Sequence, residues 1–289
     1  TIGNFDGVHS GHQEVLSRIS DECIKEQLKL VVITFTPHPI QILNPKEHYQ
    51  INSYEERREL LTKLKIDYLL EIEFNRDISM RSPKDFLDEF IFSGVEPRKF
   101  YLGHDFAFGA QKKGDHNFVK EYCEKRATDV VVLSPYDVGG DKVSSTVIRN
   151  ELSKGELQAV SKLLGRDYYI RGRIIKGAGR GKQIGIPTAN LALDNYRCYP
   201  KNGVYITRTK FGDTFWHSVT NIGHNPTFTN GSSVFVETHI LDFNLDIYGN
   251  EIEVSFVKRL RDEIKFSSVN DLIEQIHIDI NKTREYFND

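Results

Sequence analysis

The chain has 289 residues, of which 39% are hydrophobic and 27% charged, and its formal net charge is −3. That charge argues against a dedicated nucleic-acid binder, which would carry a basic excess, and no apolar run reaches the roughly 20 residues of a membrane span. The first residues lack the basic and apolar regions of a signal peptide, and the three cysteines show no CxxC spacing. We therefore expect a cytoplasmic protein of one large or two ordinary domains.

The first half of the sequence alternates helical patterns with short buried strands. Ser53 with Glu56 forms a capping box, and Ser82 with Pro83 marks a second helix start. In chain order we predict a helix over His9–Leu28, a strand over Leu30–Phe35, a helix near 53–65, a strand over Asp67–Phe74, a helix from Ser82 to Gly94, a strand over Lys99–Gly103, a helix near 116–126 and a strand over Asp129–Ser134. Strands separated by helices predict a mostly parallel sheet. Because Thr1 stands at a strand-to-turn junction, we expect the opening strand of this sheet to lie outside the numbering.

The pattern changes from about Tyr168 onward. Short β-rich segments separated by Gly, Asn, Asp and Pro predict a small antiparallel barrel. Ser268–Phe287 carries apolar residues at near-helical spacing and predicts a closing helix, while helices near 146–153 and 156–164 join the two halves. The predicted domains are therefore 1–164 and 165–289.

The motif GNFDGVHSGH, at residues 3–12, stands where a strand should turn into a helix. Gly3 and Gly7 allow close approach of the backbone to a ligand, and a helix N-terminus attracts phosphate. His9 and His12 are three residues apart, so both can donate hydrogen bonds to phosphate oxygens as charge develops. Asp6 either orients this site or forms an Asx-turn. The alternative is a capped helix whose histidines are solvated.

A second candidate phosphate element is SSTVIR at residues 144–149. Ser144, Ser145 and Thr146 can cap a helix and coordinate phosphate oxygens, and Arg149 supplies a forked donor. Simple N-capping without a ligand explains the same pattern.

The segment 177–191 reads GAGRGKQIGIPTANL and is the densest motif in the chain. It lacks Walker A spacing, but Gly179 and Lys182 belong to a flexible, cationic stretch suited to phosphates. Thr188 and Asn190 are two apart, so in extended chain their oxygens face one side and suit a Mg²⁺ completed by ATP oxygens. The alternative is a Gly-rich turn followed by an ordinary Asn.

These motifs together resemble the bacterial bifunctional riboflavin kinase and FAD synthetase family. HxGH at residues 9–12 resembles the nucleotidyltransferase signature, and the stretches at 34–39, 103–109 and 144–149 resemble the FxPHP, GxDFxFG and SSTxIR segments of its flavin branch. The resemblance implies a Rossmann-like nucleotidyltransferase domain followed by a riboflavin kinase barrel with a C-terminal helix. It also makes His38, Asp105 and Phe106 flavin-binding candidates, although loop and core roles explain the same residues.

The resemblance continues through the second half, where segment 177–191 is similar to the kinase motif GxxxGRxxGFPTAN. Lys182 stands where that motif has Arg and Ile186 where it has Phe, so a bidentate fork and an aromatic face are lost. The resemblance makes Glu237 the catalytic base, a role that suits a hydroxyl attacking a γ-phosphate. By itself, a Glu in such a strand is typical of a solvated face. Arg261 is a candidate contact for flavin or nucleotide, or part of a solvated charge run.

The resemblance implies two consecutive reactions, in which ATP first phosphorylates riboflavin to FMN and then adenylylates FMN to FAD. Riboflavin, FMN and ATP are the expected partners, Mg²⁺ the expected cofactor, and self-association stays open. No nucleic-acid or membrane partner is expected. Three alternatives remain: only one half is active, for example FAD synthetase alone; the chain is a flavin-binding regulator that has kept the fold; or it is a cytidylyltransferase, which the second half disfavours.

Overall fold

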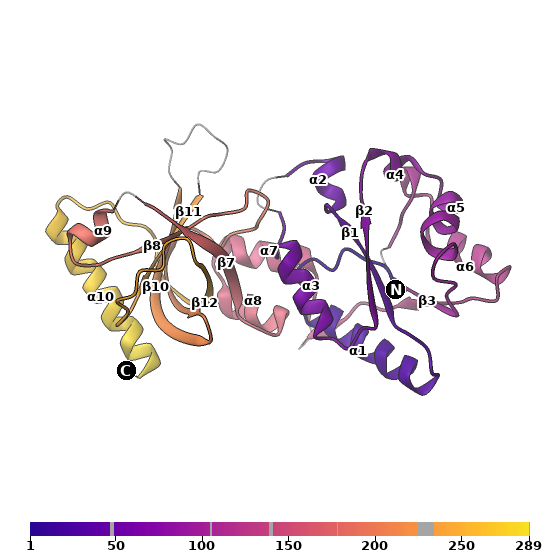
Figure 1. The fold of residues 1–289 in the computed structure, drawn as a ribbon, viewed down its shortest axis with the longest axis horizontal. Coiled ribbons are helices and arrows are strands. Elements are labelled where there is room, and N and C mark those ends of the chain that lie inside the picture. The colour runs from indigo at the N-terminus through magenta and orange to yellow at the C-terminus, as the bar shows by residue number, and fades with distance from the viewer. Residues whose placement is uncertain (47–48, 105, 139–140, 178, 225–233, 289) are drawn as a thin grey trace. The chain divides into compact units, whose positions relative to one another are not determined.

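The computed structural model describes residues 1–46, 49–104, 106–138, 141–177, 179–224 and 234–288. Contacts between residues divide the chain into two compact units, Thr1–Ser145 and Thr146–Asp289 (Figure 1). The domain boundary after residue 164 stays a prediction. No helix in these ranges is both long and apolar enough to span a bilayer.

The first unit is built on parallel strands. β1 (Val31–Thr36) pairs with β2 (Tyr68–Glu73), and β3 (Lys99–Gly103) pairs with β4 (Asp129–Leu133), both in parallel. Ile2 makes parallel bridges to Ile33 on one side and to Leu102 on the other. Residues 1–3 therefore join the two pairs in the order β2, β1, residues 1–3, β3, β4. The predicted mostly parallel sheet is confirmed.

Helices cover both faces of this sheet. Their bounds, with the short hairpin of the unit, are α1 Ser10–Lys25, α2 Pro39–Leu43, α3 Tyr54–Thr62, α4 Arg76–Met80, α5 Pro83–Phe86, the π-helix η1 Leu87–Phe92, the 3₁₀-helix η2 Ala110–Lys112, α6 His116–Glu124, β5 Asp137–Val138 and β6 Asp141–Lys142. The capping box at Ser53 and Glu56 is present with both of its hydrogen bonds. The helix predicted from Ser82 is built by α5 and continues as η1.

Alternation along β1 sends neighbouring side chains to opposite faces of the sheet. Val32 packs in a cluster with Leu16 of α1 and Leu61 of α3, whereas Ile33 packs in a second cluster with Phe86 and Leu102. Both faces are thus buried, as expected for a parallel sheet between helix layers.

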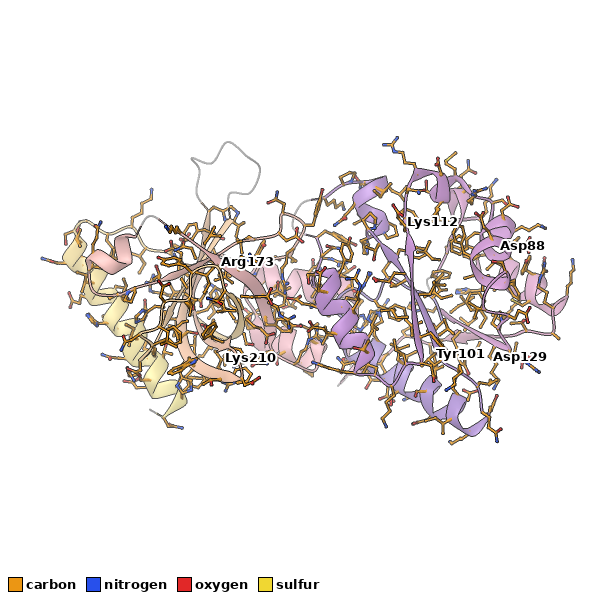
Figure 2. All side chains as sticks on the ribbon, in the orientation of Figure 1. Asp88, Tyr101, Lys112, Asp129, Arg173 and Lys210 are labelled. Carbon is orange, nitrogen blue, oxygen red and sulfur yellow. The ribbon has the colours of Figure 1, made fainter. Side chains whose placement is uncertain are left out.

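One surface network ties the helices of the second cluster together. Asp88 on η1, labelled in Figure 2, pairs with Lys84 of α5 at 2.7 Å and with Arg126 beyond α6 at 3.0 Å. Tyr122 of α6 also donates to this carboxylate. Hydrogen bonds from Lys84 and Tyr122 hold the pKa of Asp88 below its usual value.

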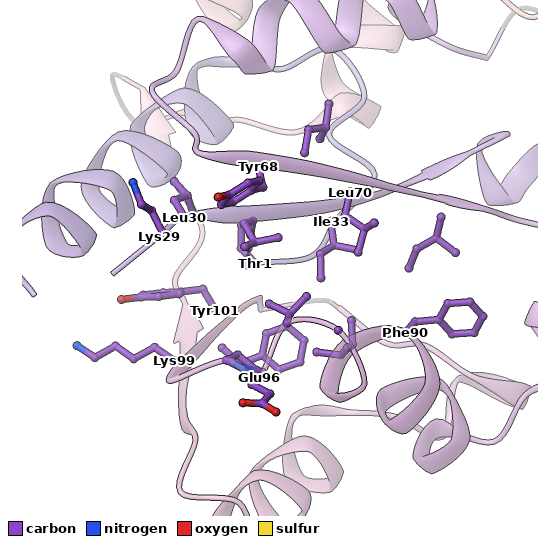
Figure 3. A pocket seen from close by; sticks show the side chains of 18 of the residues that line it. Thr1, Lys29, Leu30, Ile33, Tyr68, Leu70, Phe90, Glu96, Lys99 and Tyr101 are labelled. Carbon is purple, nitrogen blue, oxygen red and sulfur yellow. Dashed lines mark hydrogen bonds between the residues drawn. The ribbon is translucent and has the colours of Figure 1, made fainter. Parts of the chain in front are cut away.

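A cavity of about 1070 Å³ opens beside Thr1 between β1 and β3 (Figure 3). Its walls include Leu30, Ile33, Tyr68 and Tyr101. None of the predicted site residues lines it, so its position gives no support for phosphate chemistry there.

The second unit contains a closed antiparallel barrel with the strand order β10, β11, β8, β7, β12, β9. The strands are β7 Tyr168–Ile175, β8 Ala189–Leu191, β9 Gly203–Phe211, β10 Thr214–His224, β11 Val234–Ile240 and β12 Glu251–Arg261. The helices are α7 Ser145–Lys154, α8 Leu157–Leu164, α9 Arg180–Gln183 and α10 Val269–Phe287. The predicted barrel and closing helix are confirmed.

The barrel interior contains hydroxyl groups as well as apolar side chains. Thr207 Oγ1 lies 2.7 Å from Ser218 Oγ and 2.8 Å from Thr220 Oγ1, and Thr220 in turn donates to Thr238 over 2.9 Å. All four side chains are fully buried. Because every hydroxyl has a partner, this polar chain avoids the penalty of unpaired buried groups.

Candidate active sites

The turn between residues 3 and 9 leads from the centre of the first sheet into α1. Phe5, Gly7 and Val8 have φ angles of 48°, 83° and 37°, a left-handed run that most side chains avoid. A Cβ on Gly7 would also lie 3.1 Å from the Ile51 side chain, so the position requires glycine. Backbone strain of this kind concentrates at functional sites. Here the strained turn sets the direction in which α1 begins.

His9 and His12, predicted to share one side of the first helical turn, are in direct contact. Their rings stack with centroids 3.6 Å apart and planes 15° from parallel. His9 is the N-cap of α1 and its Nδ1 accepts from the His12 N–H at 3.3 Å. A Cβ on Gly11 would lie 3.2 Å from that Nδ1, which explains the glycine between the two histidines.

The His12 ring has one nitrogen without a hydrogen-bond partner in the part of the chain that the structure describes. That atom is the buried Nδ1. Desolvation, with a smaller effect from His9, holds the pKa of His12 well below its ordinary value. A phosphate at the helix N-terminus would supply the missing partner and favour the charged imidazole.

Asp6 connects this turn to two other segments. Its carboxylate Oδ1 accepts from the Ile51 N–H at 2.9 Å, and its carbonyl accepts from Ser145 Oγ at 2.8 Å. The carboxylate therefore holds the chain ahead of α3. Ser145 opens α7 beside the turn, next to the half-buried Ser144, whereas Thr146 and Arg149 follow on α7 in the second unit. Gly3 starts the turn, where its N–H donates to Ile33 O at 3.0 Å.

The three flavin-binding candidates of the first half lie in different surroundings. His38 is buried as the N-cap of α2, with Nδ1 accepting from Ile40 N at 3.2 Å. Phe106 stacks on Phe108 with centroids 5.5 Å apart. Asp105 lies outside the described residues. Flavin contacts at all three stay predictions.

Arg57 of α3 is a residue that sequence reasoning missed. Its side chain is 4% exposed. Its guanidinium donates to four acceptors: Asn4 O at 3.2 Å, Phe35 O at 3.1 Å, Thr36 Oγ1 at 2.8 Å and Glu71 Oε1 at 2.9 Å. One side chain thereby joins the HxGH turn, the end of β1 and β2. No local pattern signals this role, because all the acceptors except Glu71 are backbone or hydroxyl groups far away in sequence.

We predict that Arg57→Met destabilises the first unit by about 3 kcal/mol, because it removes a buried ion pair. The loosened turn should also lower FMN adenylylation by about 10–100-fold, since small misplacements of reacting groups are costly. Thermal unfolding and FAD formation measure the two effects. The matched control is Arg58→Met on the same helix, whose side chain is 42% exposed and whose loss should cost at most about 1 kcal/mol. Equal behaviour of the two variants would contradict the assigned role.

In the second unit, strand register brings three polar residues into one row. Glu237 of β11 lies opposite Asn190 of β8 on one side and opposite Asn221 of β10 on the other. Directly opposed residues share a face of a sheet. Val236 and Thr238 point into the barrel and are buried, so the row lies on the outer face. The structure thus brings the predicted base next to a predicted metal ligand.

This row forms part of a cavity of about 970 Å³ that also includes Thr188. The Gly-rich segment covers it closely: a Cβ on Gly177 would lie 2.3 Å from Asn190 Nδ2 and 3.0 Å from its Oδ1. A Cβ on Gly181 would lie 2.4 Å from Ile186 O. Only glycine allows the loop backbone to approach the polar row this closely.

Of the two departures from the kinase motif, only Ile186 has a side chain that the structure describes. Ile186 is only 6% exposed and fills the interior. Gly179 has a φ of 70° with open space around it, which suits a loop that adapts to a ligand. The side chain of Lys182, on α9, lies outside the described residues.

The chemistry of the donors decides which metal would fit. Within the described ranges, no three His, Cys, Asp or Glu side chains converge on a metal position. Thr188 and Asn190 offer a hydroxyl and an amide oxygen, which are hard donors suited to Mg²⁺ when phosphate oxygens and water complete the shell.

Two further residues were not predicted: Asn221, which lines this cavity, and His239, which contacts the lining residue Pro187. Asn221 Oδ1 is buried and has no hydrogen-bond partner among the residues that the structure describes. His239, two residues after Glu237, contacts Pro187 O through Nδ1 at 2.7 Å. Strand alternation could have placed His239 beside Glu237, but the contact depends on a segment 52 residues away.

Arg261 pairs with the C-terminal helix. Its guanidinium lies 2.7 Å from the Asp279 carboxylate, whose side chain is 2% exposed. This pair anchors α10 to the end of β12, and the flavin contact stays a prediction.

Comparison with known proteins agrees with this arrangement. The family model for FAD synthetase matches residues 1–147, and that for riboflavin kinase matches residues 164–287. Proteins named bifunctional riboflavin kinase/FMN adenylyltransferase are 33% identical in Listeria monocytogenes over 99% of this chain and 91% of that protein, and 34% identical in Bacillus subtilis with the same coverage. A crystal structure of a Streptococcus pneumoniae protein described as a macrolide-efflux protein has a TM-score of 0.86 and 32% identity, over 98% of this chain and 92% of that chain. The chain belongs to the bifunctional riboflavin kinase/FMN adenylyltransferase family.

Proposed function

We propose that this chain phosphorylates riboflavin to FMN in its second unit and adenylylates FMN to FAD in its first, with ATP as donor in both reactions. The observation that carries the proposal is the row of Asn190, Glu237 and Asn221 beneath the Gly-rich loop, on the same chain as a stacked HxGH pair. A flavin-binding regulator would need neither a base beside hard oxygen donors nor imidazoles at a helix N-terminus.

In the kinase reaction the primary hydroxyl of riboflavin attacks the γ-phosphorus of ATP. Glu237 accepts the hydroxyl proton as the new P–O bond forms, and the bond from the γ-phosphorus to the bridging oxygen breaks to release ADP. Thr188 and Asn190 would hold Mg²⁺, which neutralises the phosphate charge when bound. The backbone around Gly179 and the charge of Lys182 would orient the phosphates.

In the adenylyl transfer a phosphate oxygen of FMN attacks the α-phosphorus of ATP, and pyrophosphate leaves. No protein nucleophile is needed, because a phosphate monoester is already anionic. His9 and His12 would donate to the phosphate oxygens at the N-terminus of α1, together with Ser144 and Ser145 of the same unit. Thr146 and Arg149 stay predicted phosphate ligands. The stacked rings and the strained turn hold these donors before ATP binds, so little reorganisation is required.

The three cysteines are free and buried, which suits the reducing cytoplasm where we propose that the protein works. We propose riboflavin, FMN and ATP as its ligands and no nucleic acid, in keeping with a net charge of −3.

The test incubates the full chain with riboflavin, or separately with FMN, in the presence of Mg-ATP, and resolves the flavins by chromatography. We expect FMN and FAD from riboflavin, and FAD from FMN. Replacing ATP with CTP should abolish both. If riboflavin yields no FMN, the kinase assignment fails; if FMN yields no FAD, the adenylyltransferase assignment fails.

A further inference from the structure

We propose that His239 is a positioning residue of the kinase site, which ties the Pro187–Asn190 segment to the strand that carries Glu237. The inference rests on the proposed function. It starts from a side-chain contact between β11 and the segment ahead of β8, in which His239 Nδ1 lies 2.7 Å from Pro187 O.

The backbone ladder between these strands includes one predicted metal ligand, Asn190, but ends before the other, Thr188. β8 pairs with β11 at two positions, Asn190 opposite Glu237 and Ala189 opposite Thr238. The next position in the same register would place Thr188 opposite His239. β8 begins only at Ala189, so Thr188 lies beyond the strand. Thr188 therefore depends on other contacts for its position relative to Glu237.

The His239 side chain supplies such a contact. Pro187 has no N–H, so its own backbone can hydrogen-bond to a neighbouring strand only through its carbonyl oxygen. A carbonyl oxygen accepts, so Nδ1 of His239 must carry the proton. The imidazole thus extends the pairing past the end of the backbone ladder and fixes the peptide that leads into Thr188.

The same geometry links the base to the metal ligands. His239 and Glu237 are two residues apart on β11, so both project from the outer face of the barrel. Both side chains are partly buried there, between the buried interior positions Val236, Thr238 and Ile240. A rigid strand therefore carries the base at one position and holds the metal-binding segment at the other. Groups that orient metal ligands in this way typically change metal affinity by 10–100-fold when they are removed.

The experiment compares His239→Phe, His239→Asn and His239→Gln in the full chain. Phe keeps an apolar ring without a donor, the Asn amide nitrogen lies near the position of Nδ1, and the Gln amide nitrogen lies near that of Nε2. We expect the Mg²⁺ concentration that half-saturates FMN formation to rise about tenfold in the Phe and Gln variants and to stay within about threefold of wild type in the Asn variant.

A binding measurement provides a second readout. Calorimetric titration with Mg-ADP should show about tenfold weaker binding to the Phe and Gln variants, while ADP without metal binds all variants alike. FAD formation from FMN by the same chain should not change. The control is His217→Asn, because His217 lies on the neighbouring strand β10 and stacks on Phe287 of α10 with ring centroids 3.9 Å apart. It should leave Mg²⁺ dependence unchanged.

Three outcomes would overturn the inference: unchanged Mg²⁺ dependence in the Phe variant, equal behaviour of the Asn and Gln variants, or equal weakening of ADP with and without metal. If the Phe variant does not fold, the Asn and Gln pair decides. A wild-type chain that forms no FMN refutes the proposed function instead, and Mg-ADP binding still tests the role of His239.

Discussion

Glu237→Gln is expected to slow FMN formation from riboflavin by about 10²–10⁴-fold, which is the usual contribution of a general base. The amide keeps the shape of the side chain but accepts the hydroxyl proton poorly. Because Glu237 lies on the outer face of β11 rather than in the interior, the barrel should keep its stability. FAD formation from FMN, which uses the other unit, should stay at the wild-type level.

Chromatography of the flavins after single turnovers measures this effect without interference from product release. Glu253→Gln is a suitable control. Glu253 lies on β12, pairs with Arg171 of β7 at 3.1 Å and has no assigned part in the reaction. If Glu237→Gln forms FMN at the wild-type rate, Glu237 is not the base. The proposal that the row of Asn190, Glu237 and Asn221 is the kinase site would then be wrong.

His9→Asn and His12→Ala are expected to reduce FAD formation from FMN by about 10²–10³-fold each, the usual loss when one preorganised donor to a transition state is removed. The two changes differ in their structural effect. Asn is among the best N-cap residues, so His9→Asn retains the cap of α1 and removes only the imidazole. His12→Ala removes a ring that stacks on His9 and meets Phe5 edge-on at 5.1 Å.

Rates of FAD formation, with the thermal unfolding temperature beside them, separate chemistry from folding. FMN formation from riboflavin serves as the internal reference. His116→Ala removes a histidine that contacts Gly103 O at 2.8 Å outside the HxGH turn, and it should leave the rate within about threefold of wild type. Retained FAD synthesis in His9→Asn would show that the imidazole caps the helix and does nothing more.

Much of the fold could be predicted because local chemistry and tertiary structure agree. The capping box at Ser53 and the β-branched run of β1 are local signals, and the alternation in β11 predicts one buried face. Helices α2, α4 and α9 were not predicted, since each has only four or five residues and shows too little periodicity. Chain connectivity predicts a barrel, but the order of its strands depends on long-range pairing.

The candidate site residues also fall into those that local sequence spacing brings together and those that long-range pairing brings together. His9 and His12 come together through helical spacing alone, which a sequence shows directly. Asn190 and Glu237 meet only because β8 and β11 are neighbours in one particular register. Arg57 could not be recognised, because two of its acceptors are backbone carbonyls that any residue type could provide, and the side-chain acceptors Thr36 and Glu71 are distant in sequence.

The hydroxyl chain inside the barrel has a consequence for the wall that carries Glu237. A slip of β11 by one residue relative to β10 would turn Thr238 out to solvent and bring Glu237 into the barrel interior. The slipped state would lose a hydrogen bond and also bury an unpaired carboxylate, so two independent penalties act against it. The buried hydroxyls therefore help to fix the register of β11. Although they do not contact a substrate, they determine that Glu237 lies on the outer face of the barrel.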